Sequence, residues 1–193
     1  MTTDDRLQSD VAAALAQDVD ANFERLVTGY KDRVFAFVLN LVADRFAAEE
    51  IAQETFVEAY RALCGYAPPR RRALSIRAWL YTIALNRVRN RARARGLGET
   101  LPLEDALATA RADAREEPAA RADRAESAAE LRSALARLAL RYRAPVVLRH
   151  IDGRPYAAIA EILDQPVGTV KANVHRGLAL LRADLQTRNR HAD

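Results

Sequence analysis

Five arginines recur at every second position in one stretch of this chain, where they could bind a polyanion. They are Arg87, Arg89, Arg91, Arg93 and Arg95, and residues 70–96 carry nine arginines with no acidic residue. In a bare helix, each i,i+4 pair of like charges is unfavourable by about 0.2–0.5 kcal/mol. A phosphate backbone would offset that repulsion, and the release of its counterions would add affinity. The pattern therefore favours a nucleic-acid contact over a simple solvated face.

Two aromatic residues, Tyr66 and Trp79, flank a basic loop. The arginines of this loop and of the following segment are Arg70, Arg71, Arg72 and Arg77. Aromatic rings beside a basic groove can stack on unpaired bases, which is how single strands are usually held. We expect Tyr66 to be the better candidate for stacking, and Trp79 to belong mainly to the hydrophobic core.

A second polar cluster is acidic and lies on a different predicted helix. Its members are Glu49, Glu50, Gln53, Glu54 and Glu58. At 100° per residue these positions span about half of the helix surface, while Phe56 and Leu63 face the other way. Such an arc is most often a solvated face. The alternative is a docking surface for a protein partner.

Residues 156–163 and 167–176 form two amphipathic segments separated by a tight turn, which predicts a helix-turn-helix. At the turn we expect a positive φ at Asp164, where glycine would be easiest. The second helix would present cationic and amide groups to phosphates and base edges in a major groove. These candidates are Thr169, Lys171, Ala172, Asn173, His175 and Arg176, with the Thr169 hydroxyl as a helix cap. The alternative is an ordinary helical hairpin with solvated polar residues.

Catalytic and metal-binding patterns are missing from the sequence. Cys64 is the only cysteine, so neither an intrachain disulfide nor a cysteine-rich zinc site can form. His150, His175 and His191 are too far apart in sequence to suggest a metal site. There is no phosphate loop, and no nucleophile has a plausible neighbouring base. We therefore expect a protein that is not an enzyme and that needs no cofactor or metal.

The elements that must position these residues are helices. Apolar residues recur at helical spacing along most of the chain, and no stretch alternates long enough to predict a strand. The sequence predicts an all-α protein with two small helical bundles joined by a flexible linker, the C-terminal bundle containing the helix-turn-helix. The expected division is an acidic tail at 1–20, a bundle at 21–96, a linker at 97–127, a bundle at 128–187 and a tail at 188–193.

Local signals place the helices of the first bundle. We expect a long helix capped by Asn22, and a second helix that is capped by Asp44 and runs to about Leu63. Residues 65–69 contain Gly and Pro and should break the chain, so that a third helix starts near Ser75.

Charge is divided unevenly along the chain. The formal net charge is −6 over residues 1–69, +9 over 70–96, −4 over 97–127 and +5 over 128–193. A chain built in this way can contact a protein and a nucleic acid through separate surfaces. Its acidic N-terminus is unlike a secretory signal, and no apolar run approaches the ~20 residues needed to cross a bilayer. We therefore expect a cytoplasmic protein without membrane insertion.

Three segments carry a family resemblance through their order and spacing: AEEIAQETF at 48–56, RAWLYTIALN at 77–86 and GTVKANVHR at 168–176. Together they resemble the extracytoplasmic-function (ECF) group of sigma factors of bacterial RNA polymerase. In that family the first segment binds the polymerase clamp, the second helps to read the −10 promoter element, and the third reads the −35 element. The resemblance covers about residues 20–95 and 128–185.

The resemblance implies a sigma factor that binds core polymerase and directs promoter-specific initiation. Residues 21–96 would then be region 2, and residues 128–187 would be region 4. The implied core-binding residues are Glu49, Glu50, Gln53 and Glu54. The implied −10 residues are Tyr66, Arg70, Arg71, Arg72, Arg77, Trp79, Asn86, Arg87, Asn90 and Arg91, and the −35 residues are the helix-turn-helix candidates named above. The implied partners are the clamp coiled coil of the largest polymerase subunit, the flap of the second subunit, duplex and melted promoter DNA, and an anti-sigma factor.

Two other interpretations account for parts of the sequence. A stand-alone helix-turn-helix transcriptional regulator would explain the C-terminal half, but it leaves the acidic and arginine-rich helices unexplained. A sigma mimic that sequesters an anti-sigma factor would have no need for nine arginines in residues 70–96.

Overall fold

The computed structural model describes the backbone of residues 3–94 and 118–192, and the side chains of residues 6–94 and 128–187. Every regular element in these ranges is a helix. The first bundle contains α1 (Thr3–Gln17), α2 (Val19–Val42), α3 (Arg45–Gly65), α4 (Pro68–Arg72) and α5 (Ile76–Ala94). The second contains α6 (Pro118–Arg137), α7 (Leu140–Val146), a π-helical turn (Val147–Ile151), α8 (Tyr156–Leu163) and α9 (Val167–Ala192). The all-α prediction is confirmed for the described residues.

Acidic caps start the two long helices of the first bundle. Asp44 caps α3 as expected, because its Oδ1 accepts a hydrogen bond from the backbone N–H of Ala47 at 2.9 Å. Asp18, rather than Asn22, caps α2 by accepting from the N–H of Ala21 at 3.0 Å. Asn22 lies within α2 and donates its side-chain amide to the carbonyl of Asp18. The helix therefore begins one turn earlier than the apolar pattern predicted.

The expected N-terminal tail is instead mostly a packed helix. Within α1, Val11, Ala12 and Leu15 are buried in the core of the first bundle. Leu7 approaches α2 closely, because a methyl group added at Gly29 would lie 3.4 Å from its Cδ1. The i,i+4 spacing of Leu7, Val11 and Leu15 was the signal for this helix. The acidic residues around it obscured the pattern.

The boundaries of the second bundle also differ from the prediction. Helix α6 begins at Pro118, inside the segment expected to be linker, and α9 continues to Ala192 through most of the expected C-terminal tail. The rest of the expected linker, residues 97–117, lies outside the described residues. Proline at the first helical position suits a helix start, because its missing N–H would have no helical partner there.

The helix-turn-helix consists of α8, a short turn and the start of α9. The predicted positive φ at Asp164 is confirmed at 53°, and its N–H bonds back to the carbonyls of Ala160 and Glu161. Helix α9 crosses α7 very closely at Gly177. A methyl group at Gly177 would lie 2.7 Å from Cγ2 of Val146 and 3.1 Å from the carbonyl oxygen of Tyr142. Only glycine fits this crossing without movement of α7.

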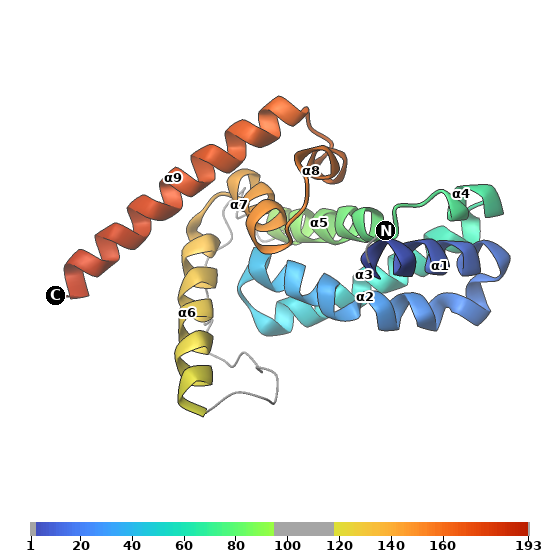
Figure 1. Ribbon diagram of the computed structural model, residues 1–193, viewed down its shortest axis with the longest axis horizontal. Helices are drawn as coiled ribbons and strands as arrows, with labels where there is room; N and C mark the ends of the chain where they lie inside the picture. The colour runs from blue at the N-terminus through green and yellow to red at the C-terminus, as the bar shows by residue number, and fades with distance from the viewer. Residues whose placement is uncertain (1–2, 95–117, 193) are drawn as a thin grey trace.

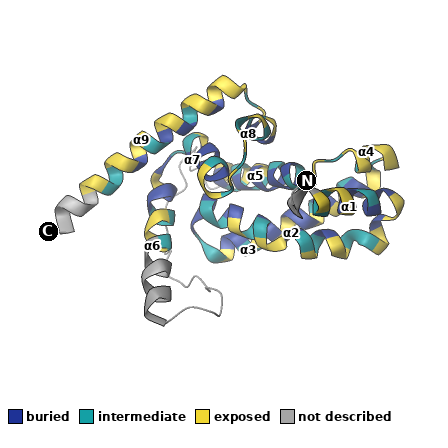
Figure 2. Ribbon diagram, in the orientation of Figure 1, coloured by how far each residue is buried: buried dark blue, intermediate teal, exposed yellow. Residues whose placement is uncertain are grey.

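The two bundles also pack against each other. Helix α5 lies against α8, and the C-terminal part of α2 lies near α6 and α7 (Figure 1). Buried apolar residues from both bundles form one continuous core cluster. The prediction of two bundles is confirmed, but in this structure they are not held only by the connection between them. Helix α9 projects away from the first bundle, and its outer side is exposed along residues 167–187 (Figure 2).

Candidate functional site

The outward face of α3 combines exposed apolar and polar residues. Phe46 is 81% exposed and Val57 51% exposed, and Tyr60 is also exposed. At 100° per residue, positions 46, 50, 53, 57 and 60 fall within an arc of about 80°. Phe46 lies at the centre of this arc, Gln53 is about 20° to one side of it, and Glu50 is at one edge. We call these five residues the α3 stripe. Large exposed side chains gathered in one patch are typical of an interaction surface.

The sequence pattern predicted only the polar half of the α3 stripe. Phe46 and Tyr60 lie outside the acidic run, and their i+14 separation gives no obvious signal in a one-dimensional pattern. In the structure, the phenol of Tyr60 donates a hydrogen bond to Oδ1 of Asp20 at 2.6 Å, and its ring packs edge-on against Phe23. This hydrogen bond raises the pKa of Tyr60 to about 12. Contacts from α2 thus fix the orientation of the Tyr60 ring.

The acidic residues of α3 lie beside arginines of α5. Arg91 Nη1 is 2.5 Å from Glu50 Oε2, and Arg87 is 2.6 Å from Glu58 Oε2. Glu54 is a weaker partner of Arg87, at 3.8 Å. The sequence suggested separate acidic and basic surfaces, but here the two run along the same edge of the bundle. Arg91 therefore holds Glu50 at the edge of the α3 stripe, and Arg87 holds Glu58 beside it. Glu49 pairs with Arg45 within α3 at 3.0 Å.

The basic loop contains the short helix α4, whose arginines differ in their surroundings. The guanidinium of Arg70 lies 3.7 Å from the ring centre of Tyr66, and that ring lies 6.1 Å from the ring of Trp79. Arg72 is exposed. Tyr66 and Trp79 are both half-buried and pack against the core. The exposed guanidinium of Arg70 therefore covers the Tyr66 ring, which lies beside Trp79.

Arg71, by contrast, is bound within the protein. It donates to the carbonyl of Leu63 at 3.0 Å and to that of Leu15 at 3.3 Å. It thereby joins α1, α3 and α4. These contacts give Arg71 a structural role, and as a predicted DNA contact it is the least accessible of the three loop arginines.

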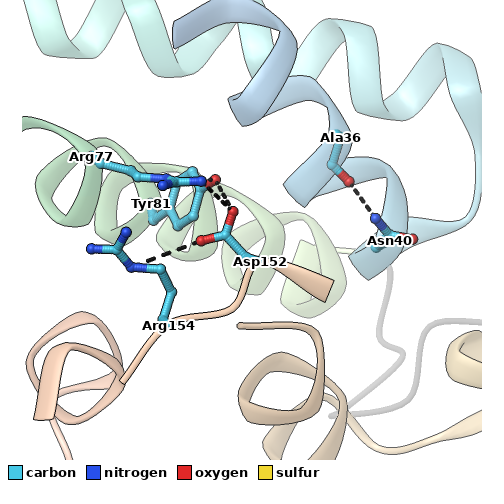
Figure 3. Close-up of polar contacts among 6 residues, drawn as sticks. All are labelled: Ala36, Asn40, Arg77, Tyr81, Asp152 and Arg154. Atoms are coloured by element: carbon cyan, nitrogen blue, oxygen red, sulfur yellow. Dashed lines mark hydrogen bonds and ion pairs between the residues drawn. The ribbon is translucent and has the colours of Figure 1, made fainter. Parts of the chain in front are cut away.

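Helix α5 carries the other predicted −10 residues on different faces. Asn86 and Asn90 are exposed and accept hydrogen bonds from Arg89 at 3.3 Å and Arg93 at 3.0 Å. Arg77 faces the second bundle instead. Its guanidinium lies 2.7 Å from Oδ1 of Asp152, which also accepts from the phenol of Tyr81 at 2.9 Å (Figure 3).

Most predicted −35 residues are exposed near the start of α9. They are Thr169, Lys171, Ala172, His175 and Arg176. Asn173 is half-buried and donates to Oε1 of Gln165 in the turn at 3.4 Å. Helix α9 begins at Val167, so Thr169 is its third residue and not the expected cap. The arrangement resembles a groove-reading helix with the outer side of its first turns exposed, while Lys171 and Arg176 lie 5.7 Å and 6.0 Å from the ring centres of Tyr156 and Tyr142.

Other classes of site find no support in the part of the chain that the structure describes. There, no group of three His, Cys, Asp or Glu residues could hold a metal ion. Similarly, none of the helices searched is both long and apolar enough to span a bilayer.

Each of the two bundles matches a protein-family model. Residues 26–97 match the model described as Sigma-70 region 2, and residues 128–181 match Sigma-70, region 4. Relatives at least 30% identical to the chain include named ECF sigma factors. The chain belongs to the ECF group of RNA polymerase sigma factors. The predicted resemblance is therefore confirmed, and the stand-alone regulator is not favoured, because it has no use for a region 2.

Named relatives match this sigma factor over nearly its whole length. The RNA polymerase sigma-H factor of Pseudomonas aeruginosa is 31% identical over 176 residues, covering 88% of this chain and 89% of the relative. The ECF RNA polymerase sigma factor SigW of Bacillus subtilis is 32% identical over 176 residues, covering 88% and 91%.

Solved structures share the fold. CnrH, in complex with the cytosolic domain of CnrY, matches with a TM-score of 0.67 and 24% identity, covering 94% of this chain and 98% of CnrH. The sigma factor RpoE of Bartonella quintana, in complex with the anti-sigma factor NepR, matches with a TM-score of 0.63 and 22% identity, covering 85% and 96%. At these identities, the likeness concerns the arrangement of helices alone.

Proposed function

We propose that this sigma factor docks on the clamp coiled coil of the largest polymerase subunit through the α3 stripe. The observation that carries the proposal is the gathering of Phe46, Val57 and Tyr60 around Glu50 and Gln53 on one exposed face. An aromatic anchor within a polar rim is the usual composition of an interface hot spot. The ion pairs with α5 support this assignment, because Arg91 and Arg87 hold the carboxylates of Glu50 and Glu58 in place before docking.

The promoter would be read by two other surfaces. The loop around α4 and the exposed side of α5 would hold the melted −10 strand, with Tyr66 and Arg70 as the stacking pair. Asn86 and Asn90 would face the junction between duplex and bubble. The first turns of α9 would enter the major groove at −35, with Lys171 and Arg176 contacting phosphates or base edges. Region 4 would also contact the flap of the second subunit.

An anti-sigma factor is a further partner in this proposal. Its support is by analogy, since the RpoE structure that shares this fold is a complex with an anti-sigma factor. The proposed site of action is the cytoplasm, where RNA polymerase and its template are found.

The experiment that tests the function is reconstituted transcription. The purified chain is mixed with core polymerase and a library of promoter fragments, and runoff transcripts are sequenced. Discrete start sites that depend on the chain are the expected result. Sequence-specific duplex binding that needs no core enzyme, with no transcripts at any salt concentration, would instead favour a regulator.

The docking surface has its own test in the full-length protein. Glu50→Arg combined with Gln53→Ala should abolish core binding, because it reverses the charge at the edge of the α3 stripe and removes the Gln53 amide from within it. Affinity for duplex DNA should be kept, since α9 is untouched. The measurement is core association by fluorescence anisotropy. Glu24→Arg, an equal charge reversal on the exposed side of α2, is the control and should bind core normally. Loss of both core and DNA binding would indicate misfolding.

A further inference from the structure

The contact between the two bundles includes a largely buried ion pair. Asp152, which follows the π-helical turn of region 4, reaches across to Arg77 near the start of α5. The Arg77 and Asp152 side chains are only 14% and 13% exposed. The same carboxylate accepts from Tyr81 at 2.9 Å and lies 3.8 Å from Arg154 (Figure 3). A charge pair this sheltered is weakly screened by salt, and removing one partner takes away the strongest ionic contact of the other.

A second polar anchor lies at the far end of α2. Arg143 of α7 is completely buried, and its guanidinium donates to the carbonyl of Leu41 in the first bundle. It also donates to the carbonyls of Ala136 and Leu138 at the end of α6. Two helix C-termini therefore direct their free carbonyls at one cation, which is a favourable arrangement. Burial lowers the pKa of Arg143 to about 10, so it remains charged at neutral pH.

The contact between the bundles also contains unfilled space. A cleft of about 400 Å³ separates α5 from α7 and α8, and Leu85, Arg93, Leu140 and Leu163 are among the residues that line it. Thr82 adds one weak contact, with its hydroxyl 3.4 Å from the carbonyl of Ile162. Interfaces between domains of one chain usually permit relative motion unless they are large and apolar. Here polar contacts add to the apolar core that joins the two bundles.

One of these contacts involves a residue that the family resemblance assigns to promoter DNA. Arg77 lies in the segment expected to help read the −10 element. In the closed arrangement its guanidinium faces a carboxylate, an anion that it can bind in much the same geometry as a phosphate. Asp152 and a DNA phosphate would therefore compete for the same cation. Helix α8 of the helix-turn-helix also packs against α5.

From this geometry we infer that the Arg77–Asp152 pair holds the free sigma factor in a closed, inactive arrangement, in which Asp152 takes the position of a −10 phosphate on Arg77. When the contact between the bundles opens, the side of α5 that carries Arg77 becomes exposed. Arg77 can then bind a phosphate of the melted −10 strand. The inhibition is built into the chain and requires no anti-sigma factor. Its effect on initiation rests on the function proposed above, whereas the closed arrangement itself does not.

The first test measures the shape of the full-length chain in solution. Asp152→Ala should increase the radius of gyration, measured by small-angle X-ray scattering, by several ångströms relative to the wild type. Asp184→Ala is the matched control. It removes a carboxylate that pairs with an arginine at 2.5 Å, but its partner, Arg137, lies in the same bundle. The control changes the net charge equally and should leave the shape unchanged. A wild type that is already extended, or an Asp152→Ala variant as compact as wild type, would overturn the inference.

The second test uses charge reversal, which remains informative if Asp152→Ala folds poorly. Arg77→Asp and Asp152→Arg should each open the chain, whereas the double variant should restore most of the compact shape. Circular dichroism reports whether each variant keeps its helices. If the double variant is no more compact than the single variants, the pair does not close the molecule.

The third test measures access to α5 with a fluorescent thymidine 20-mer as the probe. Asp152→Ala should bind this single strand about threefold or more tightly than Asp184→Ala at low salt, because one additional arginine reaches the phosphates. Equal affinities would show that Arg77 is not released to nucleic acid. If no variant supports transcription but Asp152→Ala expands, the proposed function fails while the closed arrangement stands.

Discussion

At the scale of single residues, arginines with the same charge serve different roles in this sigma factor. Arg71 joins backbone segments, Arg87 and Arg91 hold carboxylates of α3, and Arg77 binds Asp152 across the bundles. Arg176, by contrast, is exposed on the proposed groove-reading face of α9. From the sequence, the family resemblance implies the same −10 role for Arg71, Arg77, Arg87 and Arg91. Their partners come from segments that are distant in the chain.

Arg176 gives the sharpest prediction at this scale. Arg176→Ala should weaken duplex binding and lower the magnitude of the salt slope of log affinity by about one, because one phosphate contact is lost. The measurement is a titration of promoter duplex at several salt concentrations. Arg182→Ala, which removes an exposed cation nearly two turns further along α9, is the control and should leave the slope unchanged. An unaltered slope for Arg176→Ala would exclude it from the phosphate contacts.

At the scale of the elements, close approach matters more than amphipathic pattern. Helix α9 crosses α7 at a position where only glycine fits, and α1 packs its small apolar face into the first bundle despite an acidic surface. Helix periodicity predicted most of the long helices. It did not predict α4, because five residues beginning with two prolines carry no periodic signal.

Gly177 provides the prediction for this scale. Gly177→Ala should destabilise the protein by about 1–3 kcal/mol, because the added methyl overlaps Val146 and the backbone of Tyr142. The measurement is the free energy of unfolding in urea. Gly168→Ala is the control on the same helix, since nothing lies within 4 Å of its added methyl group. It should leave stability unchanged or raise it by up to about 1 kcal/mol through helix propensity. A Gly177→Ala variant as stable as Gly168→Ala would show that the crossing adapts.

At the scale of the whole molecule, α5 serves both bundles at once. One side faces α3 with its carboxylates, and another faces region 4 through Arg77 and Tyr81. The same helix is therefore part of the proposed polymerase-binding and promoter-binding surfaces and of the contact between the bundles. A change in the position of region 4 on α5 would therefore affect both of these surfaces and the contact between the bundles.

This contact predicts a dependence of stability on alkaline pH. Burial, and then the nearby carboxylate of Asp152, raise the pKa of Tyr81 above its usual value of about 10. Its folded pKa is higher than its unfolded pKa, so the stabilisation is present below pH ~10 and is lost as the pH rises further. Denaturant unfolding between pH 8 and 11 should show this loss in the wild type, and a smaller loss in Tyr81→Phe. Identical pH profiles for the two proteins would contradict this origin.

The sequence by itself determined the helical class, the two bundles, the family and the list of residues that could contact polymerase or DNA. These follow from local spacing and from short segments that keep their order along the chain. Only the tertiary structure decided which arginines are paired, that Phe46 and Tyr60 of α3 are left exposed, and that Arg77 meets Asp152. Those contacts join positions up to 75 residues apart, as in the bond from Arg77 to Asp152. Their geometry depends on how the helices pack, and helical periodicity describes one helix at a time.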